Sequence, residues 1–100
     1  MNKDYNFLED IYYIIEKRAK GKSATSYTKS LLKKGKKRIA QKVSEESTEL
    51  IIDYLSGTKK RTIEEASDLI YHLLILLYSK KITLKDIEKE LKKRKNVRQQ

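Results

Sequence analysis

Apolar residues recur every three or four positions along most of this chain, which is the spacing of amphipathic helices. The first such stretch, FLEDIYYIIEKRAK, is expected to end near Gly21. Its apolar side is made of Phe7, Ile11, Ile14 and Ile15. After the turn GKSATS, the stretch SYTKSLLKKG predicts a short helix with Ser26 as its N-cap and Gly35 near its end.

Two longer apolar patterns follow. A helix is expected from about residue 36 to 56, ending at Gly57, and its apolar stripe consists of Ile39, Val43, Leu50 and Tyr54. The next helix is expected to begin at Thr62, because Thr62 and Glu65 match a capping box. Residues 69–78 of this helix are apolar nearly all round, so it should lie at the centre of the fold or between two subunits.

A last helix is expected to start at Thr83, with a narrow apolar stripe beneath a basic surface, and the tail at about 95–100 should be frayed. The sequence therefore predicts an all-α protein, a bundle of four to five helices that forms a single domain over residues 1–100. With 38% hydrophobic residues in 100, the chain is marginal for a large isolated core, so we expect dimerisation to complete the bundle.

The composition indicates the cellular compartment in which the protein is expected. The absence of cysteine excludes disulfides and thiolate zinc sites, and it fits a reducing cytosol. The N-terminus MNKDYNFLED has no apolar signal-peptide core. The longest apolar stretch, LIYHLLILLY, is about half of the roughly 20 residues that a membrane span needs. We therefore expect a cytoplasmic protein that has no membrane partner.

The net charge of +10 is distributed unevenly along the chain. Residues 17–42 contain eleven Lys and Arg and no acidic residue, whereas residues 45–68 contain seven Asp and Glu. A basic segment beside an acidic one suits a small phosphorylated ligand that needs both protein cations and carboxylate-bound metal ions. The excess of Lys and Arg alone would allow nucleic-acid binding, but the acidic patch disfavours it.

The stretch KVSEESTELI places three carboxylates on adjoining rows of one helix: Glu45, Glu46 and Glu49. Glu46 lies at the edge of the apolar stripe, so its carboxylate should point toward the interior. On the next helix, Glu65 and Asp68 repeat the pattern at the start of the apolar run. If the two helices pack antiparallel, Glu46 and Glu49 face Glu65 and Asp68. Four such oxygen donors would suit Mg²⁺, or alternatively Mn²⁺.

Other polar residues are candidates for substrate contacts. Three basic residues at or just before the acidic stretch could bind phosphate oxygens: Lys34, Arg38 and Lys42. Tyr27 could stack on a base, although a packing role is as well supported. His72 either assists at the site or is a core histidine hydrogen-bonded to Asp68, and it is not assigned a catalytic role.

Three strings together resemble the phosphoribosyl-ATP pyrophosphohydrolases of histidine biosynthesis: SYTKSLLKKGKKRIAQ (26–41), KVSEESTE (42–49) and EEASDLIYHLL (64–74). The resemblance covers roughly residues 5–94. The EExxE and ExxD pair is shared by MazG-like all-α nucleoside triphosphate pyrophosphohydrolases in general. The SYT and DLIYH strings indicate the histidine enzyme.

This resemblance implies Mg²⁺-dependent hydrolysis of phosphoribosyl-ATP to phosphoribosyl-AMP and pyrophosphate by a homodimer. Glu46, Glu49, Glu65 and Asp68 would be the metal ligands. Glu45 would be a further ligand or the base that orients water, so that Glu45 and Glu46 are the catalytic candidates. Two alternatives stay open: a MazG-like enzyme that removes ordinary or damaged nucleotides, and a non-catalytic basic helical protein that binds nucleic acid.

Overall fold

The computed structural model describes residues 6–22 and 26–97, and these residues form five helices. The helices are α1 (Phe7–Lys20), α2 (Tyr27–Lys34), α3 (Lys36–Ser56), α4 (Lys59–Ser79) and α5 (Leu84–Val97). The expected all-α class is confirmed. No helix within the described residues is both long enough and apolar enough to span a bilayer.

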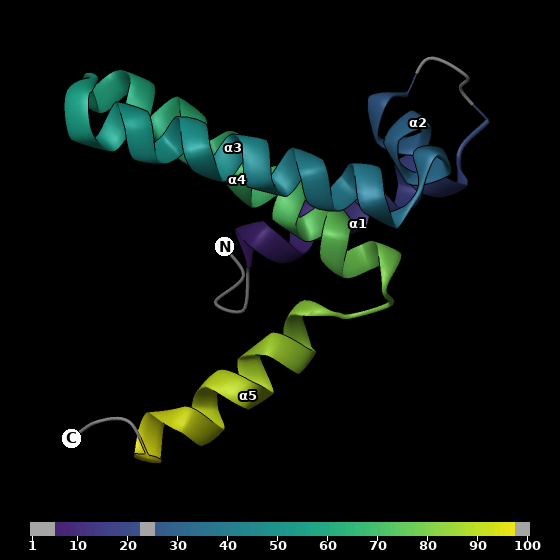
Figure 1. Cartoon of the computed structure of the whole chain (residues 1–100). Coiled ribbons are helices and arrows are strands. Elements are labelled where there is room, and N and C mark those ends of the chain that lie inside the picture. Colours follow the sequence, from purple (N-terminus) through teal and green to yellow (C-terminus); the bar gives the residue numbers. More distant parts are fainter. Residues whose placement is uncertain (1–5, 23–25, 98–100) are drawn as a thin grey trace.

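Helices α3 and α4 form a long antiparallel hairpin around which the other elements are arranged (Figure 1). Helices α1 and α2 pack against the same end of this hairpin and against each other. Helix α5 packs only against α1 among the described helices and projects away from the rest. The hairpin therefore has one end covered by α1 and α2 and one end that the described residues leave uncovered.

The hydrophobic core lies at the covered end. Its buried members come from four helices: Ile15 of α1, Leu31 of α2, Ile39 of α3, and Leu74 and Ile75 of α4. Each belongs to the apolar side that helical spacing predicts for its segment. These five side chains hold the first half of α3 against the second half of α4, and so they fix how the two long helices face each other.

The turn between α3 and α4 corrects one expectation. Helix α4 begins at Lys59 rather than Thr62, because Thr58 is its N-cap and accepts a hydrogen bond from the Arg61 amide at 3.1 Å. Thr62 lies inside the helix, where its hydroxyl donates to the Thr58 carbonyl at 2.9 Å. Either threonine can cap a helix, and the short turn through Gly57 leaves no room for the later one.

The last helix begins as expected. Thr83 and Asp86 form a reciprocal capping box, with Thr83 N–H donating to Asp86 Oδ2 at 2.9 Å and Asp86 N–H donating to Thr83 Oγ1 at 3.1 Å. The backbone is helical to Val97, and the expected fraying of the tail stays a prediction. Residues 98–100 lie outside the described part of the chain.

The junction between α2 and α3 depends on a single glycine. Gly35 has φ 96° and ψ 177°, a backbone conformation that is essentially limited to glycine. We expect Gly35→Ala to lower the free energy of unfolding by roughly 1–3 kcal/mol, although an added Cβ would meet no atom within 4 Å. Urea unfolding followed by circular dichroism measures this loss. Gly21→Ala is the control, because Gly21 has φ −70°, and its added Cβ would crowd only the Lys17 carbonyl oxygen at 3.2 Å. A loss in Gly35→Ala no larger than in this control would contradict the prediction.

Candidate active site

Three carboxylates from the two long helices meet between α3 and α4. One oxygen each of Glu46, Glu49 and Glu65 lies within 4.8 Å of the other two. Glu46 and Glu65 are buried, with 8% and 5% of their surface exposed, whereas Glu49 is exposed. The i, i+3 spacing of Glu46 and Glu49 places both on one side of α3, and the antiparallel packing brings Glu65 of α4 opposite them.

The two buried carboxylates each have one paired and one unpaired oxygen. Glu46 Oε1 lies 3.4 Å from Lys42 Nζ, and Glu65 Oε1 lies 2.5 Å from Arg61 Nη2. Glu46 Oε2 and Glu65 Oε2 are buried and have no hydrogen-bond partner. A buried acceptor without a partner opposes folding. A cation between the two helices would satisfy both oxygens, and an all-carboxylate donor set fits Mg²⁺ or Mn²⁺.

The pKa of Glu65 shows that its ionised carboxylate is disfavoured in this buried position beside Glu49. Burial raises the pKa of the Glu65 carboxyl above its usual value, and the neighbouring Glu49 carboxylate raises it further, while Arg61 opposes the shift. A raised pKa means that the folded protein favours the protonated carboxyl more strongly than the unfolded chain does. Once the pH exceeds this raised pKa, ionised Glu65 therefore destabilises the fold unless a cation joins it.

Arg61 is a site residue that the sequence analysis missed. Its guanidinium contacts Glu65, Glu64 at 2.6 Å and Asp53 at 3.8 Å, so it joins the start of α4 to the end of α3. The i, i+3 and i, i+4 spacing to Glu64 and Glu65 was a signal that could have identified it. Its contact with Asp53 could not be read from local spacing, because it depends on how the hairpin packs.

Two of the three predicted phosphate-binding cations lie beside the carboxylates. Lys42 Nζ is 3.6 Å from Glu45 Oε1, and Arg38 Nη1 is 3.8 Å from Glu45 Oε2. Burial by itself lowers the pKa of Lys42, but Tyr27, Glu46 and Glu45 together raise it above its ordinary value, so the ammonium stays charged. The predicted residue Lys34 is on α2 and takes no part in these ion pairs.

Tyr27 joins this region through a hydrogen bond to His72. Tyr27 Oη lies 2.6 Å from His72 Nε2, and His72 Nδ1 lies 2.8 Å from the backbone carbonyl of Asp68. Because a carbonyl oxygen only accepts, Nδ1 carries the proton, Nε2 is the acceptor and Tyr27 donates. Burial raises the pKa of the Tyr27 hydroxyl, which keeps this proton in place. His72 is therefore a buried histidine bonded to Asp68, one of the two roles considered for it.

A second pair of hydrogen bonds lies beside the first. Thr28 Oγ1 is 2.6 Å from Tyr71 Oη, and Arg18 Nη1 donates to the same Tyr71 oxygen at 2.7 Å. The Tyr71 hydroxyl therefore contacts both Arg18 and Thr28. The SYT string on α2 and the DLIYH string on α4 thus meet, with Tyr27 bonded to His72 and Thr28 bonded to Tyr71. Residues of these two strings therefore hold α2 against α4 next to the carboxylates.

Asp68 stands apart from the other predicted ligands. Its side chain is exposed, and its carboxylate is not among the three that converge between α3 and α4. Its negative charge still contributes to raising the pKa of Glu65, so it lies on the rim of the same region. Its role as a fourth ligand stays a prediction.

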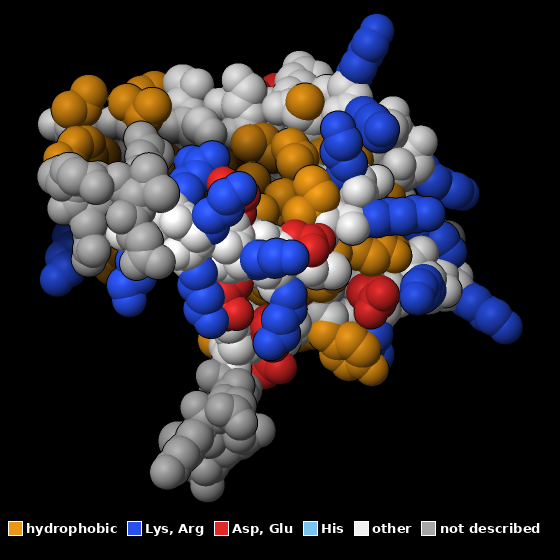
Figure 2. All heavy atoms as spheres, turned by 90° about the horizontal axis from the view of Figure 1, so that it is seen from below, with side chains coloured by type: hydrophobic (Ala, Val, Ile, Leu, Met, Phe, Trp, Pro, Cys, Tyr) orange, Lys and Arg blue, Asp and Glu red, His pale blue; other side chains and the backbone are white. Residues whose placement is uncertain are grey.

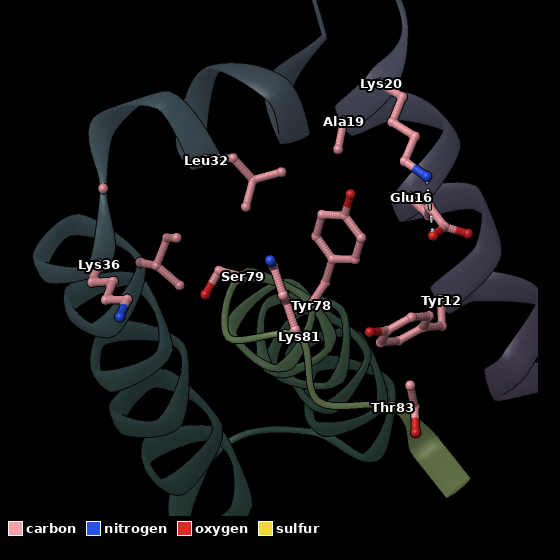
Figure 3. Close-up of a pocket in the computed structure, with 12 residues that line it drawn as sticks. Tyr12, Glu16, Ala19, Lys20, Leu32, Lys36, Tyr78, Ser79, Lys81 and Thr83 are labelled. Atoms are coloured by element: carbon pink, nitrogen blue, oxygen red, sulfur yellow. Dashed lines mark hydrogen bonds and ion pairs between the residues drawn. The ribbon is translucent and has the colours of Figure 1, made fainter. Parts of the chain in front are cut away.

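A cavity of about 650 Å³ lies elsewhere, between α1, the α2–α3 junction and the C-terminal end of α4 (Figure 3). Tyr12, Tyr78 and Lys81 form part of its wall (Figure 3). Its one carboxylate, on Glu16, is 3.5 Å from Lys20 Nζ. With no cluster of carboxylates, this cavity does not offer the metal chemistry of the α3–α4 site.

Comparison with known proteins supports the resemblance seen in the sequence. The family described as phosphoribosyl-ATP pyrophosphohydrolase matches residues 8–95. A phosphoribosyl-ATP pyrophosphatase of Sulfolobus acidocaldarius is 48% identical over 89 residues, covering 89% of this chain and 94% of the relative. One of Clostridium acetobutylicum is 47% identical, covering 87% and 79%. The histidine biosynthesis bifunctional protein HisIE of Bacteroides thetaiotaomicron is 43% identical, covering 88% of this chain and 43% of the relative.

The Glu49 carboxylate adds negative charge beside Glu65 without an ion pair of its own among the described residues. We expect Glu49→Gln to raise the Tm of the metal-free protein by roughly 1–4 °C, because one like-charge contact is removed. Mg²⁺ should raise the Tm of the wild-type protein and have little effect on this variant. Thermal unfolding followed by circular dichroism, with EDTA and with Mg²⁺, measures both effects.

Glu88→Gln on α5 is the matched control for this experiment, because Glu88 is an exposed carboxylate whose ion pair with Lys92 is far from the site. The control should keep the full Mg²⁺-dependent rise in Tm. A Glu49→Gln variant that keeps the same rise as the control would exclude Glu49 from metal binding.

Proposed function

The chain belongs to the phosphoribosyl-ATP pyrophosphohydrolase family, and from this premise we propose that it hydrolyses phosphoribosyl-ATP to phosphoribosyl-AMP and pyrophosphate in histidine biosynthesis. The observation that carries the proposal is the group of carboxylates between α3 and α4, whose two buried oxygens have no partner. We place the reaction in the cytoplasm, where ATP-derived metabolites are made and used.

Glu46, Glu49 and Glu65 would hold a divalent cation, Mg²⁺ in our proposal, with Asp68 as a further ligand from the rim. A bound Mg²⁺ would supply charge neutralisation for the triphosphate and a positive field at the oxygens that become negative during hydrolysis. Lys42 and Arg61 neutralise Oε1 of the buried carboxylates. They leave Glu46 Oε2 and Glu65 Oε2 without a partner, and these oxygens would be free to bind the cation.

Lys42 and Arg38 bind the phosphates that arrive beside this site. In the free protein both cations contact the Glu45 carboxylate, at 3.6 and 3.8 Å. A triphosphate carries more negative charge than one carboxylate, so it draws the two cations toward itself and releases Glu45. The freed carboxylate then accepts a proton from the attacking water, which is the role of a general base. Substrate binding and activation of Glu45 are coupled in this scheme.

Tyr27 presents its ring to the substrate while its hydroxyl stays fixed. The side chain is 50% exposed, and its hydroxyl is bonded to His72. The ring therefore cannot swing away without breaking that hydrogen bond. A fixed, half-exposed aromatic face beside the phosphate-binding cations is suited to stacking on adenine.

We also propose that one domain, residues 1–100, works as a homodimer through the uncovered end of the hairpin. This end carries five apolar side chains that are 57–75% exposed: Ile51, Ile52, Tyr54, Leu55 and Ile63. Figure 2 shows hydrophobic side chains at the left, the side on which the hairpin ends in Figure 1. Contiguous exposed apolar surface of this kind marks a protein interface, and a second hairpin would bury it by completing a helical bundle.

The activity itself is tested by pyrophosphate release from phosphoribosyl-ATP, with Mg²⁺ and with EDTA, beside a panel of nucleoside triphosphates. We expect Mg²⁺-dependent release from phosphoribosyl-ATP and much slower release from the panel. Glu46→Gln should lower the rate at least ~100-fold, because the loss of a metal ligand removes several kcal/mol of transition-state stabilisation. Its far-ultraviolet circular dichroism should stay helical.

Glu90→Gln on α5 is the control for Glu46→Gln and should keep the wild-type rate. Comparable release from ordinary nucleoside triphosphates would favour a nucleotide-removing enzyme instead. The absence of release from any of these compounds would overturn the proposal.

The dimer is tested by Leu55→Glu, which places a charge on a side chain that is 74% exposed at the end of the hairpin. We expect the wild-type protein to be a dimer and this variant to be largely monomeric, because the charge would have to be buried in the interface. Size-exclusion chromatography with light scattering gives both masses. Leu91→Glu, at a 60% exposed leucine of α5, should remain dimeric. A dimeric Leu55→Glu protein would place the interface elsewhere.

A further inference from the structure

A second cationic region lies on α2, separate from the cations that contact the carboxylates. A cavity of about 420 Å³ is lined by Lys22, Lys29, Ser30, Lys33 and Lys34. No carboxylate lines this cavity, and none of its four lysines is in an ion pair with a carboxylate of the described residues.

One hydrogen bond within the fold joins this cluster of lysines to the end of α1. Lys29 Nζ donates a hydrogen bond to the carbonyl of Gly21, the residue that caps α1. Lys33 follows one turn later on the same side of α2, and Lys22 comes directly after the cap. Four ammonium groups around one cavity repel one another, and an anion in the cavity would relieve this repulsion. The region is therefore suited to a phosphate group.

The lysine cluster is aligned with the candidate active site along α2. Tyr27 and Lys34 are seven residues apart, which places them on the same side of the helix and about 10 Å apart along its axis. Thr28 and Leu31 lie on the adjoining side of the helix and are buried in the core. On the other side of Tyr27, the exposed surface of α2 continues from Lys34 through Ser30 to Lys33, so it leads from the Tyr27 ring to the cluster of lysines.

Phosphoribosyl-ATP has the matching arrangement of groups. It carries a triphosphate at one end, the adenine in the middle and the phosphate monoester of the phosphoribosyl group at the other end. With the triphosphate at the carboxylates and the adenine on Tyr27, the phosphoribosyl group extends along α2. An ordinary nucleoside triphosphate has nothing to place there.

We propose that Lys22, Lys29, Lys33 and Lys34 bind the phosphate monoester of the phosphoribosyl group and so distinguish phosphoribosyl-ATP from ATP. This inference rests on the proposed function. It reassigns Lys34, which the sequence predicted as a phosphate-binding residue, from the triphosphate to the opposite end of the substrate. The cluster is a specificity site, because it contacts the substrate far from the bond that is cleaved.

The experiment combines two protein forms with two substrates. The protein forms are the wild type and the double variant Lys33→Ala with Lys34→Ala. The substrates are phosphoribosyl-ATP and ribosyl-ATP, the same compound without its terminal phosphate monoester. Because charge-assisted hydrogen bonds to a phosphate are lost, kcat/KM of the double variant for phosphoribosyl-ATP should fall roughly 10- to 100-fold. Its kcat/KM for ribosyl-ATP should equal that of the wild type.

A control variant removes the same charge elsewhere: Lys89→Ala with Lys93→Ala on α5, two exposed lysines that make no ion pair in the described structure. It should keep wild-type kcat/KM for both substrates, and circular dichroism checks the helical content of each protein. A loss that is equal for the two substrates, or no larger than in the control, would overturn the assignment of the lysine cluster. Failure of the wild type to release pyrophosphate from phosphoribosyl-ATP would instead overturn the proposed function.

Discussion

The burial of two carboxylates side by side between α3 and α4 is the constraint on which the rest of the structure depends. Glu46 and Glu65 are at most 8% exposed, and like charges in such a place oppose folding. In the fold, only one oxygen of each carboxylate is paired with a cation. Lys42 and Arg61 contact Oε1 of the two carboxylates, while Oε2 of each stays without a partner. Full pairing would stabilise the free protein more, but it would leave no oxygen for a metal ion.

Holding such a site together requires packing that lies elsewhere. The five core side chains sit at the covered end of the hairpin, and α2 is attached there by two polar contacts rather than by apolar packing alone. Tyr27 bonded to His72 and Thr28 bonded to Tyr71 fix both the position and the rotation of this eight-residue helix. A helix of this length is unstable by itself. Its side chains therefore keep their positions beside the carboxylates only because contacts with α4 hold the helix in place.

The sequence predicted most of the fold, because local signals determine most of it. Helical spacing and the capping residues gave the bounds of α1, α2 and α3 correctly, and Ser26 caps α2 as expected. The start of α4 was wrong because Thr58 and Thr62 offer equivalent caps, and only the length of the turn chooses between them. The same limit applies to the site. Spacing brought Glu46, Glu49 and Glu65 together, but it could not show that Asp68 stays on the rim.

The two ends of the hairpin differ in what surrounds them, and the carboxylates lie between them. Glu46 and Glu49 are near the middle of α3, so the site is within reach of both ends. At the covered end, α2 supplies aromatic and cationic side chains, along which we propose that the substrate extends. At the uncovered end, apolar side chains are exposed, and there we propose that a second copy binds. Because destabilising carboxylates lie in a chain with a small core, the proposed partner subunit and the proposed cation would each add stability that offsets the free-energy cost of burying these carboxylates.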